Sequence, residues 1–266
     1  MKRPNTSSAH GTQQRAWDTV AYNEILARCA LPVDQARLKA LTTPHAGDWL
    51  HAPPLTAVGL RLSDEAIRVA TGFRLGTIIC QPHICVCGTM VDARGLHGLA
   101  CRKSAPRHIR YSQLNDLIWR AIKKAHIPAS KEPIGLSRSD GKRPDGARLV
   151  PWSRGKPLAW DVTVPDTYTA SHIQATAISA GAAGEKASDN KRVKYNDLAT
   201  THIFVPIAVE TSGAWCSQSA PFIEYLGRRI TAVTNEPLET TYLYQRLSVS
   251  LQRSKAVAFN NTFPET

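Results

Sequence analysis

The clearest helical pattern in the chain follows residue 104. Apolar side chains recur there at helical spacing, at Leu114, Leu117, Ile118, Ala121, Ile122 and Ala125. The cations Arg110, Arg120, Lys123 and Lys124 fall mostly elsewhere on the cylinder. The pattern therefore predicts an amphipathic helix that packs with one face and can meet phosphates with the other.

Alternating apolar positions predict a buried strand in PLAWDVTV (157–164), and a second strand is expected in IFVPIAVET (203–211). The proline of the second strand favours an edge position or a bulge. An Ala-rich helix with a break near Gly181 is expected between the strands. Two further apolar patterns, near 222–233 and 243–251, predict closing helices over the sheet. The whole pattern indicates a mixed α/β fold.

Two carboxylates interrupt this apolar framework. Asp145 belongs to a Gly-containing turn signal, RPDG, and Asp161 lies sixteen positions later inside the predicted strand. Acidic residues are depleted in strands, so Asp161 requires a reason. Two aspartates on neighbouring strands would form half a Mg²⁺ site, with substrate phosphate oxygens and water as the remaining ligands. The alternative is a surface turn and an exposed edge-strand residue.

A cluster of soft ligands precedes the predicted helix, in CVCGTMVDARGLHGLAC. Cys85, Cys87, His97 and Cys101 provide three sulfurs and one imidazole, the set that tetrahedral Zn²⁺ requires. Cys80 and His83 are substitutes for one of them. The alternative is a group of buried free cysteines with a structural histidine. A zinc ion held by all four ligands would be structural, because no coordination position is left for a substrate.

The charge of the chain indicates the class of partner that it binds. The formal net charge is +12 and the isoelectric point is about 9.7. Residues 101–148 hold twelve Lys and Arg against four Asp and Glu, directly before the second carboxylate. A basic approach to a metal site suits a phosphate backbone, although a solvated basic face gives the same count. No stretch approaches eighteen apolar residues, so we expect a soluble, intracellular protein without a membrane partner.

Arg143-Pro144-Asp145, followed by DVTV at 161–164 and KRVKY at 191–195, resembles the PD-(D/E)xK nuclease signature. The similar version is the restriction-like endonuclease domain downstream of reverse transcriptases in non-LTR retrotransposons. The resemblance implies a mixed-sheet nuclease core, a Mg²⁺ ion held by Asp145 and Asp161, and a nick in target DNA that primes reverse transcription in the nucleus. Thr163 stands where the general signature has its lysine.

The same resemblance assigns roles to other residues. It moves the lysine to the following helix, at Lys191 or Lys194 with Tyr195 beside it, and makes Glu132 a possible aid to the metal. Arg107-His108 is similar to the pair that opens the basic helix in the family. The residues expected to contact nucleic acid, target DNA or element RNA, are Arg107, His108, Arg110, Lys123, Lys124 and Arg143.

The Cys/His cluster is similar to the CCHC zinc knuckle that precedes the nuclease in that family. The predicted organisation is a disordered tail at 1–15, a helical connector at 16–79, the knuckle at 80–103 and the nuclease domain at 104–266. No polymerase sequence is present, so the chain resembles the tail of a longer ancestor. Two alternatives stay open: a catalytically inactive, zinc-containing fragment that binds nucleic acid, and a structural or protein-interaction domain.

Overall fold

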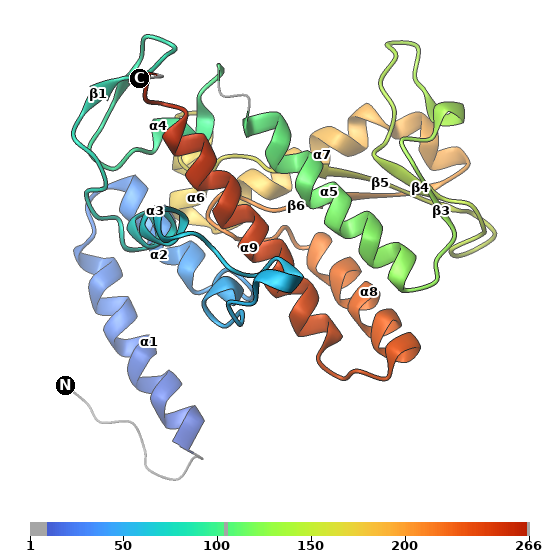
Figure 1. The fold of residues 1–266 in the computed structure, drawn as a ribbon, viewed down its shortest axis with the longest axis horizontal. Coiled ribbons are helices and arrows are strands. Elements are labelled where there is room, and N and C mark those ends of the chain that lie inside the picture. Colours follow the sequence, from blue (N-terminus) through green and yellow to red (C-terminus); the bar gives the residue numbers. More distant parts are fainter. Residues whose placement is uncertain (1–9, 104–105, 265–266) are drawn as a thin grey trace.

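A computed structural model describes residues 10–103 and 106–264. Its centre is a four-stranded mixed sheet in the order β3-β4-β5-β6 (Figure 1). The strands are β3 (Ala129–Lys131), β4 (Gly146–Arg148), β5 (Leu158–Thr163) and β6 (Ile203–Ala208). The pairs β3·β4 and β4·β5 are antiparallel, and β5·β6 is parallel. The expected mixed α/β class is confirmed at this level.

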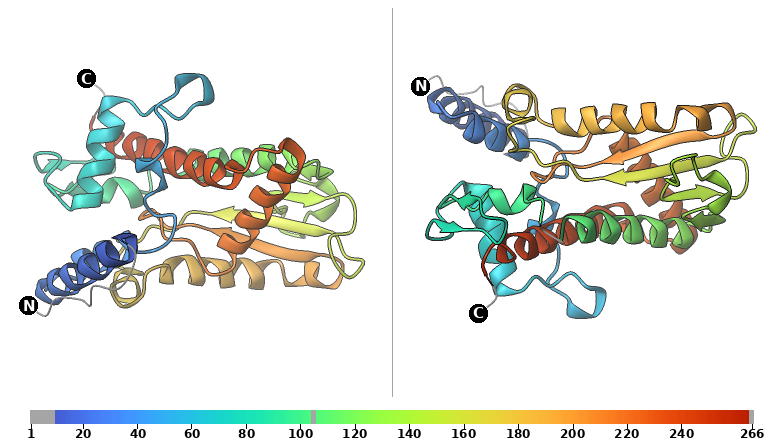
Figure 2. Two further views of the ribbon diagram at one scale, coloured as in Figure 1. Left: turned by 90° about the horizontal axis from the view of Figure 1, so that it is seen from below. Right: turned by 90° about the horizontal axis from the view of Figure 1, so that it is seen from above.

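Helices cover both faces of the sheet (Figure 2). Helices α5 (Pro106–Lys124) and α8 (Ser219–Thr234) pack on one face, and α7 (Ala182–Lys194) packs on the other. Helix α9 (Glu239–Asn260) packs mainly on α3, α5 and α8. The expectation that both closing helices lie directly on the sheet is therefore correct for α8, whereas α9 forms an outer layer.

Trp160 explains why β4, β5 and α5 meet where they do. Its side chain is fully buried in β5, and its indole N–H donates to Asn115 Oδ1 of α5 (3.1 Å). The partner removes the cost of burying the indole nitrogen. Trp160 pairs with Gly146 of β4, and a Cβ at Gly146 would lie 2.0 Å from the indole. Gly146 is thus a strand residue whose missing side chain makes room for a tryptophan.

The N-terminal helices pack beside this core. They are α1 (His10–Arg28), α2 (Pro32–Leu41) and α3 (Asp64–Leu75), and Pro32 is the first residue of α2. Ser63 caps α3 by accepting from the Ala66 N–H (3.2 Å). Phe73 of α3 and Phe259 of α9 contact edge to face in a second hydrophobic cluster. The predicted disordered segment 1–15 lies largely outside the described residues.

A small lobe joins α3 to α5. It contains the hairpin β1 (His83–Ile84) and β2 (Met90–Val91), with Gly88 in the left-handed region at the turn, and the short helix α4 (His97–Ala100). Glycine adopts such a positive φ without steric cost. The lobe sits at one end of α9 (Figure 1).

The C-terminal half of the sheet follows the predicted pattern closely. Pro206 lies in β6, which is an edge strand, as its proline indicated. The Ala-rich segment forms α6 (Ile173–Ile178) and α7, which are separated at Gly181 with φ 87°. Across the described residues, we find no helix with the length and apolar character needed to cross a membrane.

Candidate functional site

The four predicted zinc ligands converge within the small lobe. Cys85 begins the hairpin turn and Cys87 lies within it, whereas His97 begins α4 and Cys101 follows that helix. One ligand atom from each residue lies within 4.8 Å of all the others. The cluster can therefore hold one metal ion.

The spacing of these atoms fits a tetrahedral zinc site. Zn–S bonds of about 2.3 Å place two sulfurs roughly 3.8 Å apart at tetrahedral angles. The Sγ atoms of Cys85 and Cys101 are 3.7 Å apart, and Cys87 Sγ lies 3.2 Å from His97 Nε2. Burial raises the pKa of the Cys101 thiol to about 11, whereas hydrogen bonding at Thr89 lowers that of Cys87 to about 6. Zinc binding must therefore release a proton from Cys101.

The two substitute ligands are engaged elsewhere. The Cys80 thiol lies 3.4 Å from the Asp92 carbonyl oxygen. His83 stacks on Phe263 with ring centroids 4.0 Å apart, and its Nε2 lies 2.9 Å from Thr262 Oγ1. Neither residue belongs to the metal-binding cluster among the described residues.

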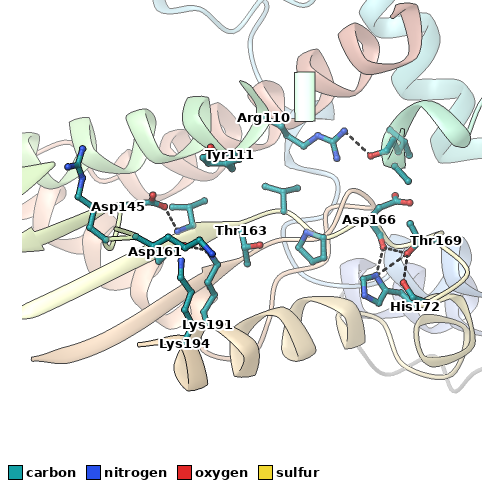
Figure 3. A pocket seen from close by; sticks show the side chains of 18 residues that line it. Arg110, Tyr111, Asp145, Asp161, Thr163, Asp166, Thr169, His172, Lys191 and Lys194 are labelled. Carbon is teal, nitrogen blue, oxygen red and sulfur yellow. Dashed lines mark hydrogen bonds and ion pairs between the residues drawn. The ribbon is translucent and has the colours of Figure 1, made fainter. Parts of the chain in front are cut away.

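A separate cavity of about 560 Å³ lies where β5 ends, between the start of α5 and α7. Asp145, Asp161, Lys191 and Lys194 all line it, and Figure 3 shows the two lysines rising from α7 toward Asp161. The structure thus brings together side chains from a loop, a strand and a helix. Thr163, at the position where the nuclease signature named above has a lysine, lines the same cavity.

Asp161 owes its position to β5. It pairs in register with Pro206 of the parallel strand β6, and its side chain is only 4% exposed. Its Oδ1 forms an ion pair with Lys191 Nζ. A buried carboxylate needs such a partner, because an unpaired charge in this environment is strongly destabilising.

Asp145 faces the same part of β5 from the neighbouring chain segment. It directly precedes β4, and its Oδ2 accepts a hydrogen bond from the Val162 N–H (2.6 Å). Burial raises the pKa of Asp145 to about 6, and the nearby charge of Asp161 adds to the effect, while Val162 and Lys191 oppose it. Two carboxylates that resist simultaneous ionisation are a suitable environment for a divalent cation.

Lys194 and Tyr195 hold the loop that carries Asp145. Lys194 Nζ donates to the Tyr195 hydroxyl (2.8 Å), which donates to the Arg143 carbonyl oxygen (2.7 Å). Burial, followed by the charge of Lys191, lowers the pKa of Lys194. Burial, followed by the charge of Asp161, raises the pKa of Tyr195. Tyr195 does not line the cavity and is a positioning residue.

Glu210 anchors the helix that carries both lysines. It is fully buried, and one carboxylate oxygen accepts from the N–H groups of Ala183 (2.8 Å) and Gly184 (3.2 Å) in the first turn of α7. Its second oxygen accepts from the Thr167 hydroxyl (3.0 Å). A carboxylate at a helix N-terminus stabilises that helix. Glu210 therefore fixes the start of the helix that carries Lys191 and Lys194.

Glu132 and Arg143 meet at the rim of the cavity. Arg143 lines the cavity, and its guanidinium donates to Glu132 Oε2 (2.6 Å). Glu132 does not line the cavity, although its backbone N–H donates to the Asp145 carbonyl oxygen (2.9 Å). The structure therefore places Glu132 beside an arginine and outside the group around Asp161.

The basic residues of α5 are distributed differently from the expectation. Arg110, expected away from the packed face, is only 2% exposed, and it donates to the Leu99 carbonyl oxygen (3.2 Å). Lys123 and Lys124 lie thirteen and fourteen residues beyond Arg110 on α5. Lys123 is exposed, and Lys124 forms an ion pair with Glu239. At 1.5 Å per residue both lie about 20 Å from Arg110. The side chains of Arg107 and His108 lie outside the described residues.

The far end of the cavity contains polar residues that sequence reasoning missed. Asp166 and His172 lie there on the loop after β5 (Figure 3), and His172 Nδ1 is 2.9 Å from the Asp166 carbonyl oxygen. Asp166 Oδ1 accepts from the Thr211 hydroxyl (2.6 Å), and burial raises its pKa. The signal available was the density of polar residues in PDTYTASH directly after a buried strand.

Comparison with protein-family models gave no match for this chain, and comparison with curated proteins gave none either.

Proposed function

We propose that this chain is a divalent-metal-dependent DNA endonuclease with a PD-(D/E)xK-type core, of the kind that makes the target-site nick in non-LTR retrotransposition. One observation carries the proposal. Two carboxylates, Asp145 and Asp161, and two lysines, Lys191 and Lys194, line a single cavity although they come from separate elements. The mixed sheet flanked by helices on both faces is compatible with such a core.

The carboxylates are the residues that would hold Mg²⁺, and they fit it because both are oxygen donors next to open cavity volume. When bound, the ion would polarise the phosphodiester and lower the pKa of a water ligand. Asp145 and Asp161 would be the protein ligands of that ion. Lys191, released from Asp161, would stabilise negative charge on the phosphate while the water oxygen bonds to phosphorus and gives its proton to solvent. The bond to the 3′ oxygen would break, and this oxygen would take a proton from solvent.

Residues around the opening favour a polyanionic substrate. Lys142 and Arg143 line the cavity beside the aspartates, and Lys194 contributes a third cation. Neutralising successive phosphates in this way produces most of the affinity for a nucleic-acid backbone. Arg143 can exchange its exposed partner Glu132, 54% exposed at the side chain, for a phosphate at little cost.

A second candidate function is nucleic-acid binding without cleavage. The observation that favours it is the engagement of both carboxylates, Asp161 with Lys191 and Asp145 with the Val162 N–H. Thr163, at the position where the nuclease signature has its lysine, also favours binding without cleavage. A metal ion must displace these contacts, and an inactive descendant of the nuclease would retain them.

The decisive experiment is nicking of supercoiled plasmid DNA by the full chain with Mg²⁺ or Mn²⁺. Asp145→Asn and Asp161→Asn should each lower the nicking rate by about 100-fold or more, because each removes a metal ligand. Asp189→Asn is the matched control, since Asp189 is an exposed acid on α7 that does not line the cavity. It should nick at the wild-type rate.

Two results would overturn the assignment of endonuclease activity to this cavity. Nicking that persists in both aspartate variants would place the activity elsewhere. Tight, salt-dependent DNA binding with no nicking under either metal would support the binding-only function.

A further inference from the structure

A second hollow lies on the outer side of the helical layer, away from the cavity that contains the aspartates. Its volume is about 790 Å³, and its walls are α5, α9 and the short helical turn η2 (Thr56–Val58). Among the described residues, none lines both this hollow and the aspartate cavity. A smaller hollow of about 260 Å³ continues it along the same two helices and shares Val58, Leu117, Arg120 and Arg246 with it. We call the two together the α5–α9 groove.

The α5–α9 groove carries a strong surplus of positive charge. The cationic side chains that line it are Arg120, Lys124, Lys131, Arg246 and Arg253. Among the described residues that line the groove, two are carboxylates, Asp116 and Glu239. The groove therefore keeps a surplus of three positive charges, which must be balanced by solvent ions or by a bound anion.

The two acidic residues cancel only part of this charge, and they hold cations in place. Asp116 is shared between Arg120 Nε (2.8 Å) and Lys131 Nζ (3.3 Å). Arg253 is held by two backbone carbonyl oxygens instead, those of Gly59 (3.0 Å) and Arg61 (3.1 Å). Contacts with neutral carbonyls orient a guanidinium and leave its charge intact. The groove is thus partly organised before any ligand binds, which lowers the entropic cost of binding.

The spacing of the arginines suits an extended anion. Arg246 and Arg253 lie seven residues apart on α9, or two helical turns, which separates them by about 10 Å along the axis. Arg120 faces them from α5. A nucleic-acid strand has one phosphate per about 3.4 Å of duplex axis, so this span accommodates several consecutive phosphates. A single small anion would engage only one end.

We propose that the α5–α9 groove is a second nucleic-acid site, which binds a phosphodiester backbone outside the proposed catalytic cavity. The ligand is recognised through its phosphates. It can come from the duplex flanking a cleavage site or from a separate RNA strand. The proposal goes beyond the endonuclease activity and does not require that the cavity cleave DNA.

The test measures binding of the full chain to a 30-base-pair duplex and to single-stranded RNA of the same sequence, without added Mg²⁺. Fluorescence anisotropy between 50 and 200 mM KCl gives the slope of log affinity against log salt. Arg120→Gln combined with Arg246→Gln should reduce the magnitude of that slope by about 2, since each lost phosphate contact removes roughly 0.9. The ligand class that shows the reduction identifies the source of the backbone.

The matched control is Arg228→Gln combined with Arg229→Gln on α8. Both arginines are exposed and lie outside the groove, and the net charge changes by the same amount. This control should keep the wild-type slope. If the double groove variant shows no thermal unfolding transition and is therefore not folded, the single variant Lys131→Gln replaces it. The expected reduction in the magnitude of its salt slope is about 1.

Unchanged slopes for both ligands in the groove variants would overturn the proposal, as would equal reductions in the groove and control variants. Failure of the nuclease assignment is a separate result. A wild-type chain that never nicks plasmid but shows the groove-dependent slope would retain this inference and lose the proposed catalysis.

Discussion

We propose a bound cation both at the Cys/His cluster and in the aspartate cavity, yet the ligands of the two places are arranged differently. The four ligands of the cluster come from seventeen consecutive residues and point at one another. The aspartates come from separate elements, and each already has a partner in Lys191 or the Val162 N–H. The first arrangement is typical of a permanent structural ion and the second of an ion that competes for its ligands.

Loss of the structural ion should have the largest effect. Structural zinc contributes on the order of 10 kcal/mol to small domains of this kind. We expect one zinc per chain by elemental analysis, and Cys85→Ser and Cys101→Ser should lose it together with protection of residues 80–103 from protease. Cys29→Ser, a change in an isolated cysteine, is the control and should retain zinc. Full zinc content in Cys85→Ser would contradict the assignment of the ligands.

Lys191→Met tests whether a metal ion can take the place of the Lys191 ammonium group beside Asp161. Without metal the variant leaves a buried Asp161 unpaired, which should cost about 2–3 kcal/mol of unfolding free energy, reduced from a fully buried pair because Lys191 is 24% exposed. Mg²⁺ should restore much of this loss by replacing the lysine, as measured by denaturation with and without the ion. Lys186→Met, on the same helix but exposed, should respond to neither change.

A Mg²⁺ response of Lys191→Met no larger than that of Lys186→Met would mean that Asp161 binds no ion.

Asp145 should make the free energy of unfolding depend on pH, with a sign opposite to that produced by an ordinary ion-paired carboxylate. Its folded pKa of about 6 exceeds the unfolded value of 3.8, so the native state holds more protons between those values. Stability contributed by the protonated form is therefore lost as pH rises from about 4 to about 6, by at most about 3 kcal/mol. Asp145→Asn should flatten that part of the stability curve in metal-free buffer, measured by denaturation across pH. A curve identical to wild type would contradict the shift.

Gly146→Ala should have the smallest effect of these. Its Cβ would lie 2.0 Å from the Trp160 indole, and overpacking of this kind costs about 1–3 kcal/mol. Because Gly146 follows Asp145, the displacement should also weaken metal binding in the cavity. Gly155→Ala is a control for glycine replacement at an open loop position, although its positive φ adds some strain. A Gly146→Ala protein as stable as wild type would show that Trp160 does not fix this strand.

Features made by residues close together in the sequence could be predicted, whereas those that depend on distant contacts could not. The zinc ligands are local, so their spacing alone identified the cluster. The strands β5 and β6, the break at Gly181 and the cap at Ser63 also follow from local patterns. The cavity could be outlined only through a motif, because the pairing of β4 with β5 depends on contacts distant in sequence.

Three features could not be obtained from local patterns. Arg110 occupies a polar position on an amphipathic helix, but it is buried and donates to the Leu99 carbonyl oxygen of the small lobe. Gly146 has the sequence context of a turn, but it lies in β4, where it pairs with Trp160 of β5 and leaves room for the indole. Lys255 is buried and its pKa falls to about 7, because burial and the charges of Arg110 and Arg74 disfavour its ammonium form. Each depends on an element that packs against it from elsewhere in the chain.

A crystal of the full chain soaked in Mn²⁺ and measured for anomalous scattering tests the central claim most directly. The account predicts a single peak in the cavity, about 2.1 Å from carboxylate oxygens of both Asp145 and Asp161, with Lys191 moved away from Asp161. No peak at saturating Mn²⁺, with Lys191 still bonded to Asp161, would contradict it.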